Sequence, residues 1–356
     1  MILTGCFAIL SGFLVDRFGP RIVITIGSCF IALGYLLMST VNSEWQYYLY
    51  YGVLVSVGMG FMVVPLLSTA AKWFTKKVGL VSGIVISGIG VGIVVMPQVA
   101  NKLISAYNWR GSFIILGIAA LILIMGLAQF LRRPPDQVRP AQEANKKPNI
   151  QIQGLSTGEA VRTRQFWLIF MCYLCINIAV LTVMVHIVPH TTDIGFSATA
   201  AATVLAVIGL VSVGAKIFMG SLADKIGNRN AIIIVAIVLA VSFTFLLFAN
   251  QIWTLYIFAV IFSLGYSGSS ATHSPVLAEY FGLRAHGALF GLTSLAANGG
   301  GAIGALLAGF IFDGTGSYNL AFIIGATMGI IILALSIPLR HLGKRAEIGA
   351  PVKIDA

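Results

Sequence analysis

The decapeptide GFLVDRFGPR at residues 12–21 occurs in the chain a second time, as GSLADKIGNR at residues 220–229. The two copies align without a gap, at an offset of 208 residues (220 − 12 = 208). Each copy places one acidic and two basic residues between long apolar stretches. Self-similarity of this kind is typical of folds built from repeated units. The repeat therefore predicts a molecule made of two halves with similar structure.

The sequence around the two copies is too apolar for a water-soluble protein. Of the 356 residues, 58% are hydrophobic and 9% are charged, and the mean hydropathy is +0.96. Soluble globular domains carry about 25% charged residues. The 39 glycines fit closely packed membrane helices, in which small residues let backbones approach one another. We therefore predict an all-α membrane protein.

Apolar runs long enough to cross a bilayer as helices, roughly 20 residues each, alternate with short polar breaks. The longest polar stretch, residues 132–165, contains four prolines and is predicted to be a cytoplasmic linker. It separates a first bundle at residues 1–131 from a second bundle at 166–340, and residues 341–356 form a cytoplasmic tail. The predicted spans are 1–15, 22–41, 46–71, 79–104, 111–131, 166–189, 198–221, 231–249, 252–275, 285–311 and 318–340.

Five predicted spans precede the linker and six follow it. The offset places Met1 opposite Gly209, in the middle of the span at 198–221 (209 − 1 = 208). The first span then lacks its outer half, and the counterpart of the span at 166–189 is absent. At roughly 20 residues per span plus loops, we expect about fifty residues to be missing before Met1, through a misassigned start site or a truncation.

The distribution of basic residues predicts the orientation of the chain. With the loop at 16–21 on the cytoplasmic side, all but three of the 22 Lys and Arg residues fall in cytoplasmic segments. Lys102 and Arg110 fall outside, and Lys216 lies within a span. Cytoplasmic loops of membrane proteins are enriched in Lys and Arg. We therefore attribute the formal net charge of +11 to basic residues in cytoplasmic segments rather than to nucleic-acid binding. The same distribution predicts a cytoplasmic C-terminus.

The loop at 12–21 resembles the sequence that the major facilitator superfamily carries between its second and third helices, and the copy at 220–229 resembles the one between helices eight and nine. The resemblance implies two pseudo-symmetric helical bundles, with eleven of the usual twelve helices present and helix 1 missing. The loop residues would hold a cytoplasmic gate closed. The alternative is a solvated turn whose charges only set the orientation. The implied gating residues are Gly12, Asp16, Arg17, Arg21, Gly220, Asp224, Lys225 and Arg229.

Four further motifs are WFTKKVG at 73–79, NWRG at 108–111, HIVP at 186–189 and DGTGSY at 313–318. They resemble the monocarboxylate transporter and oxalate/formate antiporter group, and the resemblance extends over essentially the whole chain. It implies secondary active transport of a small organic anion, with a monocarboxylate favoured, by symport or antiport. Two alternatives stay open: an efflux pump for amphipathic compounds, and a truncated homologue that does not transport.

Lys216 is the residue most informative about the substrate. It lies eight residues before Asp224 on one predicted helix, roughly 12 Å inside the membrane at 1.5 Å per residue. A cation near the bilayer centre costs about 2.5–3.5 kcal/mol, so an anionic substrate is its predicted partner. In the resembled group a cation at this position engages the substrate carboxylate. The alternative is a side chain that snorkels toward the cytoplasmic interface.

Two differences from the resembled proteins bear on the substrate and on coupling. Proton-coupled monocarboxylate transporters carry an aspartate one turn before the cation, where this chain has Ser212. Serine does not take up a proton at physiological pH, which leaves protons as an open partner. The oxalate antiporters carry a second basic residue in helix 11, whereas the span at 285–311 has only His286 at its inner edge. A single cation suits a monocarboxylate.

Three more polar residues inside predicted spans are substrate-binding candidates together with Lys216 and Ser212. His186 lies near the outer end of its span, where it either relays protons or closes the outer vestibule. His273 either lines the central cavity or packs in the core. Asn298 contacts either the substrate or a neighbouring helix.

Other classes of function find no support in the sequence. There is no nucleophile paired with a base, no metal-ligand cluster and no G-x-x-x-x-G-K-[ST] phosphate loop, so we predict neither an enzyme nor an ATP-driven pump. No cofactor, metal or nucleic acid is expected. The predicted partners are a small organic anion and the lipid bilayer. We expect a monomer in a cell membrane, with a bacterial inner membrane favoured.

Overall fold

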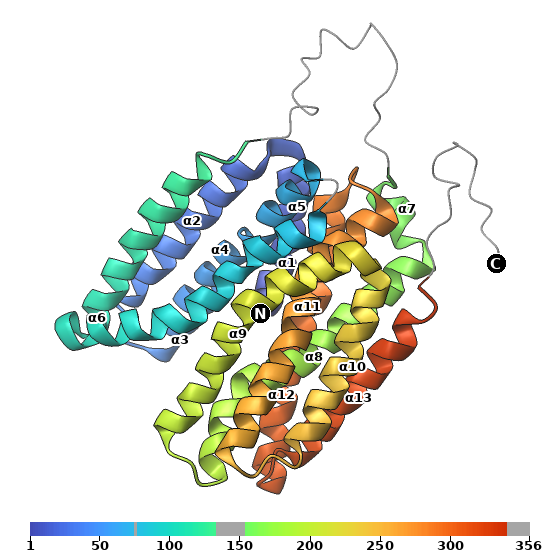
Figure 1. The fold of residues 1–356 in the computed structure, drawn as a ribbon. Coiled ribbons are helices and arrows are strands. Elements are labelled where there is room, and N and C mark those ends of the chain that lie inside the picture. The colour runs from blue at the N-terminus through green and yellow to red at the C-terminus, as the bar shows by residue number, and fades with distance from the viewer. Residues whose placement is uncertain (75–76, 133–153, 340–356) are drawn as a thin grey trace, which may run out of the picture.

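The computed structural model describes residues 1–74, 77–132 and 154–339, and shows two bundles of helices side by side (Figure 1). Most of the predicted linker and the whole predicted tail lie outside the described residues. The first bundle contains α1 (Ile2–Phe18), α2 (Pro20–Met38), α3 (Glu44–Tyr47), the π-helix η1 (Tyr48–Val55), α4 (Ser56–Gly60), α5 (Val63–Trp73) and α6 (Val78–Ala128). The second contains α7 (Thr157–Val161), α8 (Arg164–Asp193), α9 (Ala198–Ile226), α10 (Asn228–Leu246), α11 (Ile252–Phe281), α12 (His286–Thr315) and α13 (Asn319–Ser336).

The helix ends repeat at the offset that the sequence predicts. The helix α1 ends at Phe18 and α9 at Ile226 (226 − 18 = 208), and the pair α2 and α10 agrees at both ends. The sharp turns that follow α1 and α9 are made by Gly19 and Gly227, with φ of 84° and 85°. Only glycine adopts such positive φ values without steric cost. The same turn chemistry therefore produces the same corner in both halves.

The helix α6 contains two spans joined at a break. Its 51 residues would extend roughly 77 Å at 1.5 Å per residue, more than twice the bilayer core of about 30 Å. Asn108 has φ 57° and interrupts the helix, while its Oδ1 accepts hydrogen bonds from the backbone N–H groups of Arg110 (2.9 Å) and Gly111 (3.1 Å). The equivalent residue in the second half is Gly316, with φ 68°, which ends α12 (316 − 108 = 208). The two spans predicted at 79–104 and 111–131 match this division.

The described residues confirm an all-α fold with eleven helical spans. Nine helices of the described ranges are long and apolar enough to cross a bilayer. One of the nine is α6, which counts twice, and α1 adds a shorter span of 17 residues. The segments α3, η1, α4 and α5 together form one span at Glu44–Trp73. The helix α8 has no counterpart among the described residues, and which helix of a family fold this absence represents stays a prediction.

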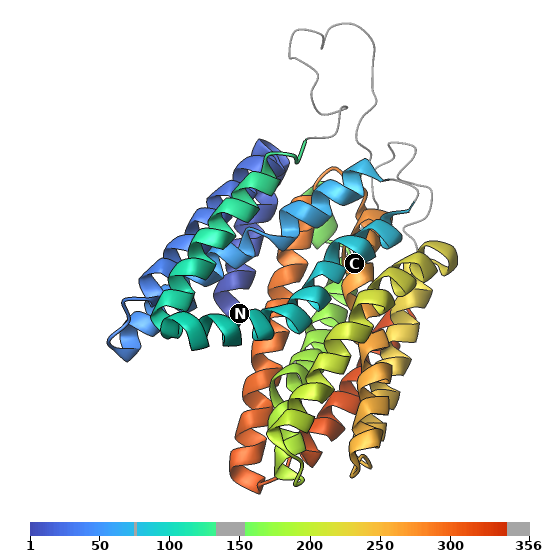
Figure 2. The same cartoon turned by 60° about the vertical axis from the view of Figure 1, so that its left-hand side comes forward.

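The two bundles contact each other mainly through two helix pairs, α1 with α12 and α6 with α9. Figure 2 shows the first half of α6 running along α9, away from the rest of its own bundle. The larger buried core lies in the second bundle, around Tyr173, Phe243 and Phe262. The space between the bundles is thus bordered on one side by the well-packed second bundle and on the other by α5 and α6 of the first bundle.

Candidate functional site

At one end of the interface the backbones of the two bundles touch at two glycine pairs. A Cβ atom on Gly12 would collide with the carbonyl oxygen of Gly287, and one on Gly79 would collide with that of Gly220. The pairs join α1 to α12 and α6 to α9, and they are related by the repeat (287 − 79 = 208). Only glycine permits helices to approach this closely.

Next to each glycine pair an aspartate of one bundle caps a helix of the other. Asp16 Oδ2 accepts from the N–H of Ala288 (3.1 Å), and its Oδ1 pairs with Lys72 Nζ at 2.7 Å. Asp224 accepts from the N–H groups of Gly79 and Leu80, both at 2.8 Å. A carboxylate at a helix N-terminus satisfies free N–H groups and complements the helix dipole. We call these two aspartates, Lys72 and the two glycine pairs the aspartate latch.

The predicted gating arginines contact their own bundles. Arg21 donates to the carbonyl of Gln129 (2.6 Å) at the end of α6, and Arg229 donates to that of Ile337 (2.6 Å) at the end of α13. Arg17 stacks over the ring of Phe18 at 5.3 Å, and Lys225 is exposed. From the predicted gating set, Gly12, Asp16, Gly220 and Asp224 make contacts between the bundles.

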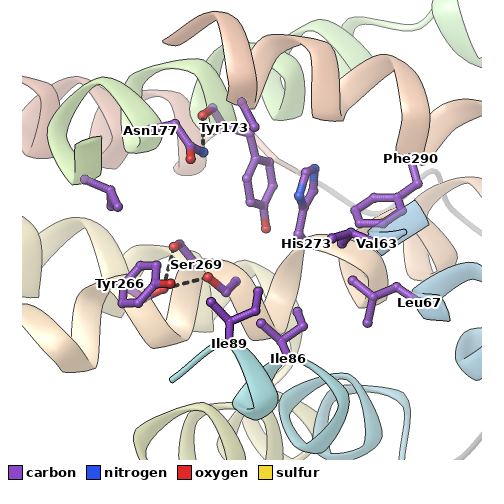
Figure 3. Close-up of a pocket in the computed structure, with 13 residues that line it drawn as sticks. Val63, Leu67, Ile86, Ile89, Tyr173, Asn177, Tyr266, Ser269, His273 and Phe290 are labelled. Atoms are coloured by element: carbon purple, nitrogen blue, oxygen red, sulfur yellow. Dashed lines mark hydrogen bonds between the residues drawn. The ribbon is translucent and has the colours of Figure 1, made fainter. Parts of the chain in front are cut away.

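A cavity of about 130 Å³ lies between α5 and α6 of the first bundle and α8, α11 and α12 of the second (Figure 3). Apolar side chains cover the side of the first bundle, whereas polar groups come from the second bundle. The residues around the cavity are Val63, Leu67, Ile86, Ile89, Tyr173, Asn177, Val180, Tyr266, Ser269, Ser270, His273, Phe290 and Ala297. A small polar molecule would therefore contact α8 and α11 with its polar groups.

Lys216 is fully buried (0% exposed) behind one wall of this cavity. Its Nζ lies 4.6 Å from the ring centroid of Tyr266 and 3.4 Å from Ser212 Oγ. Tyr266 lines the cavity, whereas Lys216 is not among the lining residues. No carboxylate among the described residues forms a salt bridge with Lys216. The arrangement is a buried cation held by a π face and one hydroxyl group.

His273 is a rigid part of the cavity wall. Its ring stacks on Tyr173 with centroids 3.8 Å apart at 16°, and meets the ring of Phe290 edge-on at 4.7 Å. His273 Nε2 forms a hydrogen bond with Thr293 Oγ1 (2.9 Å), and the hydroxyl of Tyr173 is bonded to that of Thr272 (3.1 Å). Figure 3 shows the His273 ring between Tyr173 and Phe290.

The other two predicted binding residues do not line the cavity. His186 bonds to the carbonyl of Ala305 (2.8 Å) and to the hydroxyl of Tyr318 (3.3 Å), between α8 and the far end of α12. Asn298 donates to the carbonyl of Ser294 (2.8 Å) on its own helix. Of the five predicted binding residues, the structure thus places His273 in the cavity wall, and Lys216, with Ser212 beside it, against the lining residue Tyr266. A substrate role for any of the five stays a prediction.

Sequence reasoning missed the aromatic and amide residues of the cavity. Tyr173, Tyr266 and Asn177 line it, yet each lies in a strongly apolar span where an aromatic or single polar residue is unremarkable. One available signal was spacing, because Tyr266 and His273 are seven residues apart and so share a helix face. Spacing alone does not distinguish a cavity wall from a helix contact.

Two helical bundles related by a repeat, in contact at one end and with a polar cavity between them, are an architecture found in membrane transporters. The sequence profile of the Major Facilitator Superfamily matches residues 1–234 and, in a second alignment, residues 175–353. The chain therefore belongs to this superfamily. It is a multi-pass membrane transporter and not an enzyme, as the sequence predicts.

The similar proteins agree with the resemblance found in the sequence. The oxalate:formate antiporter of Oxalobacter formigenes is 27% identical over 92% of this chain and 77% of its own length. Monocarboxylate transporter 2 of Homo sapiens is 26% identical over 92% of this chain and 72% of its own. Among solved structures, FucP in the outward conformation aligns with TM-score 0.69 at 15% identity, covering 94% of this chain and 87% of FucP. The human organic anion transporter MFSD10 aligns with TM-score 0.72 at 16% identity, covering 94% and 81%. These structural likenesses show the fold.

Proposed function

We propose that the chain is a secondary active transporter of a small organic anion, a monocarboxylate, and that Lys216 supplies the charge that binds the carboxylate. The observation that carries the proposal is the full burial of Lys216 without a carboxylate partner among the described residues. A buried ammonium is costly unless paired. An anion beside Tyr266 would provide the missing countercharge.

The relatives support the same class of substrate. The names of the similar proteins describe exchange of oxalate for formate and transport of monocarboxylates. The central site contains one buried lysine, which balances one carboxylate. The proposed orientation puts the aspartate latch and the C-terminus on the cytoplasmic side, and a bacterial inner membrane is the favoured location.

Transport in this proposal uses the latch. With the latch closed, the bundles touch at the end that holds Asp16 and Asp224. Rocking of the bundles would break these helix caps and open the central site to that side, which is alternating access. The coupling ion is not assigned, because the hydroxyl of Ser212 carries no titratable proton at physiological pH.

A second candidate is efflux of a larger amphipathic compound. It is favoured by one relative, the agnestins efflux protein AgnL12 of Paecilomyces divaricatus, which is 24% identical over 91% of this chain and 72% of its own length. The cavity argues against it. Its volume of about 130 Å³ is well below the roughly 300–1,000 Å³ of sites that hold drug-sized ligands.

The test is uptake of radiolabelled monocarboxylates into proteoliposomes that contain the chain. We expect saturable uptake of at least one acid, and its loss in Lys216→Gln, because glutamine keeps a polar side chain, one bond shorter than that of lysine, and removes the charge. Lys102→Gln is the matched control, since Lys102 is exposed on α6, and it should transport normally. Uptake that survives in Lys216→Gln would remove the carboxylate role. Absence of uptake for every acid would favour the efflux candidate.

A further inference from the structure

A buried histidine lies directly beside the aspartate latch. His286 is the first residue of α12 and precedes Gly287, which touches Gly12 of α1. Asp16 of α1 caps the N–H group of Ala288, two residues after His286. The side chain of His286 is fully buried (0% exposed). Opening of the latch would separate α1 from the start of α12, so His286 stands where the two bundles part.

The ring of His286 belongs to a small polar cluster that crosses from one bundle to the other. His286 Nε2 lies 3.0 Å from the carbonyl oxygen of Ser274 on α11 and 3.3 Å from its hydroxyl oxygen. The hydroxyl of Ser274 also donates to the carbonyl oxygen of Leu67 on α5 (3.4 Å), in the first bundle. All three residues are buried. The cluster is therefore closed off from solvent while the bundles are in contact.

The hydrogen bonds of the cluster define the neutral form of the histidine ring. A carbonyl oxygen only accepts, so Nε2 carries the proton and donates it to Ser274. Nδ1 then holds the free electron pair, and it is fully enclosed without a hydrogen-bond partner among the described residues. Buried polar atoms nearly always have a partner. Nδ1 is thus an unsatisfied atom that water reaches only when the bundles separate.

The charges around His286 oppose a second proton on the ring while the latch is closed. Three other titratable side chains act on the ring electrostatically, Asp16 from α1, Lys72 from α5 and His273 from α11. Both carboxylate oxygens of Asp16 are engaged, Oδ1 with Lys72 (2.7 Å) and Oδ2 with the N–H group of Ala288 (3.1 Å). A proton on Nδ1 would therefore create an enclosed cation near Lys72, without a hydrogen-bond partner for the added N–H group.

The repeat shows that the packing of the helices does not require this histidine. The residue equivalent to His286 at the start of α6 is Val78 (286 − 208 = 78), and the one equivalent to Ser274 is Leu66 (274 − 208 = 66). The start of α6 nevertheless touches α9 through Gly79 and is capped by Asp224. The same contact is thus made in the other half without a polar pair. The histidine adds a titratable group to one of the two contacts.

We propose that His286 is a proton-binding site of the aspartate latch, and that protonation of its Nδ1 favours separation of the bundles. The ring resists a second proton while it is enclosed, and accepts one when opening brings water to it. A ligand that binds the open form better shifts the equilibrium toward that form. Acid on the latch side therefore opens the latch. The inference goes beyond the proposed function, because it concerns the contact between the bundles and holds whatever the substrate is.

The test measures opening of the latch with a cysteine reporter at two pH values, on chains purified in detergent. Ala71→Cys, in a parent chain whose own four cysteines are replaced by alanine, places a thiol at a fully buried position beside the latch. The parent is compared with His286→Gln, whose amide keeps a donor for the carbonyl of Ser274 and takes up no proton. Both chains carry the same reporter, so the pH dependence of the thiol itself cancels from the ratio of their labelling rates.

We expect the two chains to be labelled at rates within about twofold of each other at about pH 8, where an ordinary imidazole is neutral. At about pH 5.5 the parent should be labelled up to about tenfold faster than His286→Gln, because a hydrated imidazole is half-protonated near pH 6.5 and shifts a linked equilibrium by that factor. Carboxylates and ammonium groups ordinarily keep their charge over this range. His190→Gln is the matched control, since His190 is a second buried histidine at the far end of α8, and it should respond like the parent.

Equal rates of the parent and His286→Gln at both pH values would overturn the inference, as would slower labelling of the parent in acid. A response that disappears in His273→Gln or His190→Gln and persists in His286→Gln would assign the proton to another histidine. If His286→Gln does not fold, the parent is compared with a chain that carries the exposed reporter Lys102→Cys instead. A ratio of these two rates that rises about tenfold in acid supports the proposal, and a constant ratio contradicts it. Uptake of carboxylates is measured separately, so neither result decides the proposed function.

Discussion

At the scale of single residues, the site departs from the repeat that governs the rest of the fold. Lys216 occupies the position equivalent to Ala8 in the first half (216 − 208 = 8). The glycines that face these two positions follow the repeat, since Gly83 lies against the backbone of Lys216 and Gly291 lies against that of Ala8. In the same way Tyr266 corresponds to Gly58 and His273 to Pro65. The polar groups of the cavity therefore belong to the second half alone. The repeat thus determines the arrangement of the helices, whereas the polar residues of the cavity lie at positions where the two halves differ in sequence.

Tyr266 provides the residue-scale prediction, because its ring covers the ammonium of Lys216 at 4.6 Å. Cation–π contacts are worth about 0.5–2 kcal/mol. Tyr266→Phe keeps the ring, and we expect substrate affinity within about twofold of the unaltered chain. Tyr266→Leu removes it and should weaken affinity by roughly 2- to 30-fold. Competition for radiolabelled acid in proteoliposomes measures both. Equal affinity of the Phe and Leu variants would mean that the ring only fills space.

Single residues also show what a sequence can predict about a site. Lys216, Asp16 and Asp224 were recognisable because a charge inside or beside an apolar span is rare and costly. Tyr173 and Tyr266 were not, since nothing in an apolar helix tells which face meets a cavity. His273 was a candidate from the sequence, but its orientation depends on contacts with Tyr173 on α8 and Thr293 on α12, which no local pattern encodes.

At the scale of helices, the role of a glycine depends on which helix lies beside it. Gly300 on α12 sits against α8, and a Cβ there would collide with the carbonyl oxygen of Leu174. Its repeat partner Gly92 on α6 (300 − 208 = 92) has nothing within 4 Å. One residue type at equivalent positions thus has opposite surroundings, because α8 has no counterpart beside α6 among the described residues.

This difference gives a matched pair of substitutions. Gly300→Ala forces α12 and α8 apart, and overpacking of this kind costs about 1–3 kcal/mol. Gly92→Ala meets open space and reduces backbone freedom, so we expect stability to stay equal or rise by up to about 1 kcal/mol. Thermal unfolding of the two purified variants in one detergent compares them. A destabilised Gly92→Ala beside a stable Gly300→Ala would contradict the assigned helix packing.

The presence and order of the helices could be predicted from hydropathy, whereas irregularities within the helices could not. The two spans at 79–104 and 111–131 were predicted, but the left-handed conformation of Asn108 at their junction was found only in the structure. The π-helix at Tyr48–Val55 was also not predicted. Its equivalent stretch in α11 is regular α-helix, so the sequence repeat does not predict it.

At the scale of the whole molecule, the aspartate latch joins the halves by two related contacts of unequal composition. Asp224 caps two N–H groups of α6, whereas Asp16 caps one N–H group of α12 and pairs with Lys72. The residue equivalent to Lys72 is Tyr280 (280 − 72 = 208), which carries no positive charge. Between the bundles, Asp16 thus makes one cap and Asp224 makes two, while the ion pair of Asp16 with Lys72 lies within the first bundle. Loosening either one should favour separation of the bundles at this end.

Asp224→Asn and Asp16→Asn test the latch, because asparagine keeps the shape of the side chain and removes its charge. Losing the negative charge at a helix N-terminus costs about 0.3–1 kcal/mol, which corresponds to a roughly 2- to 5-fold larger population with the latch open. Ala71→Cys is a suitable reporter, since Ala71 is fully buried (0% exposed) and lines a cavity of about 390 Å³ beside Asp224. In a chain whose four cysteines are replaced by alanine, we expect a thiol reagent to label Cys at 71 faster in both variants. Asp224→Asn should have the larger effect, because Asp224 caps two N–H groups of the other bundle, whereas Asp16 caps one and its pairing with Lys72 lies within the first bundle. Labelling rates equal to those of the parent in both variants would mean that the aspartates shape the turns without holding the bundles together.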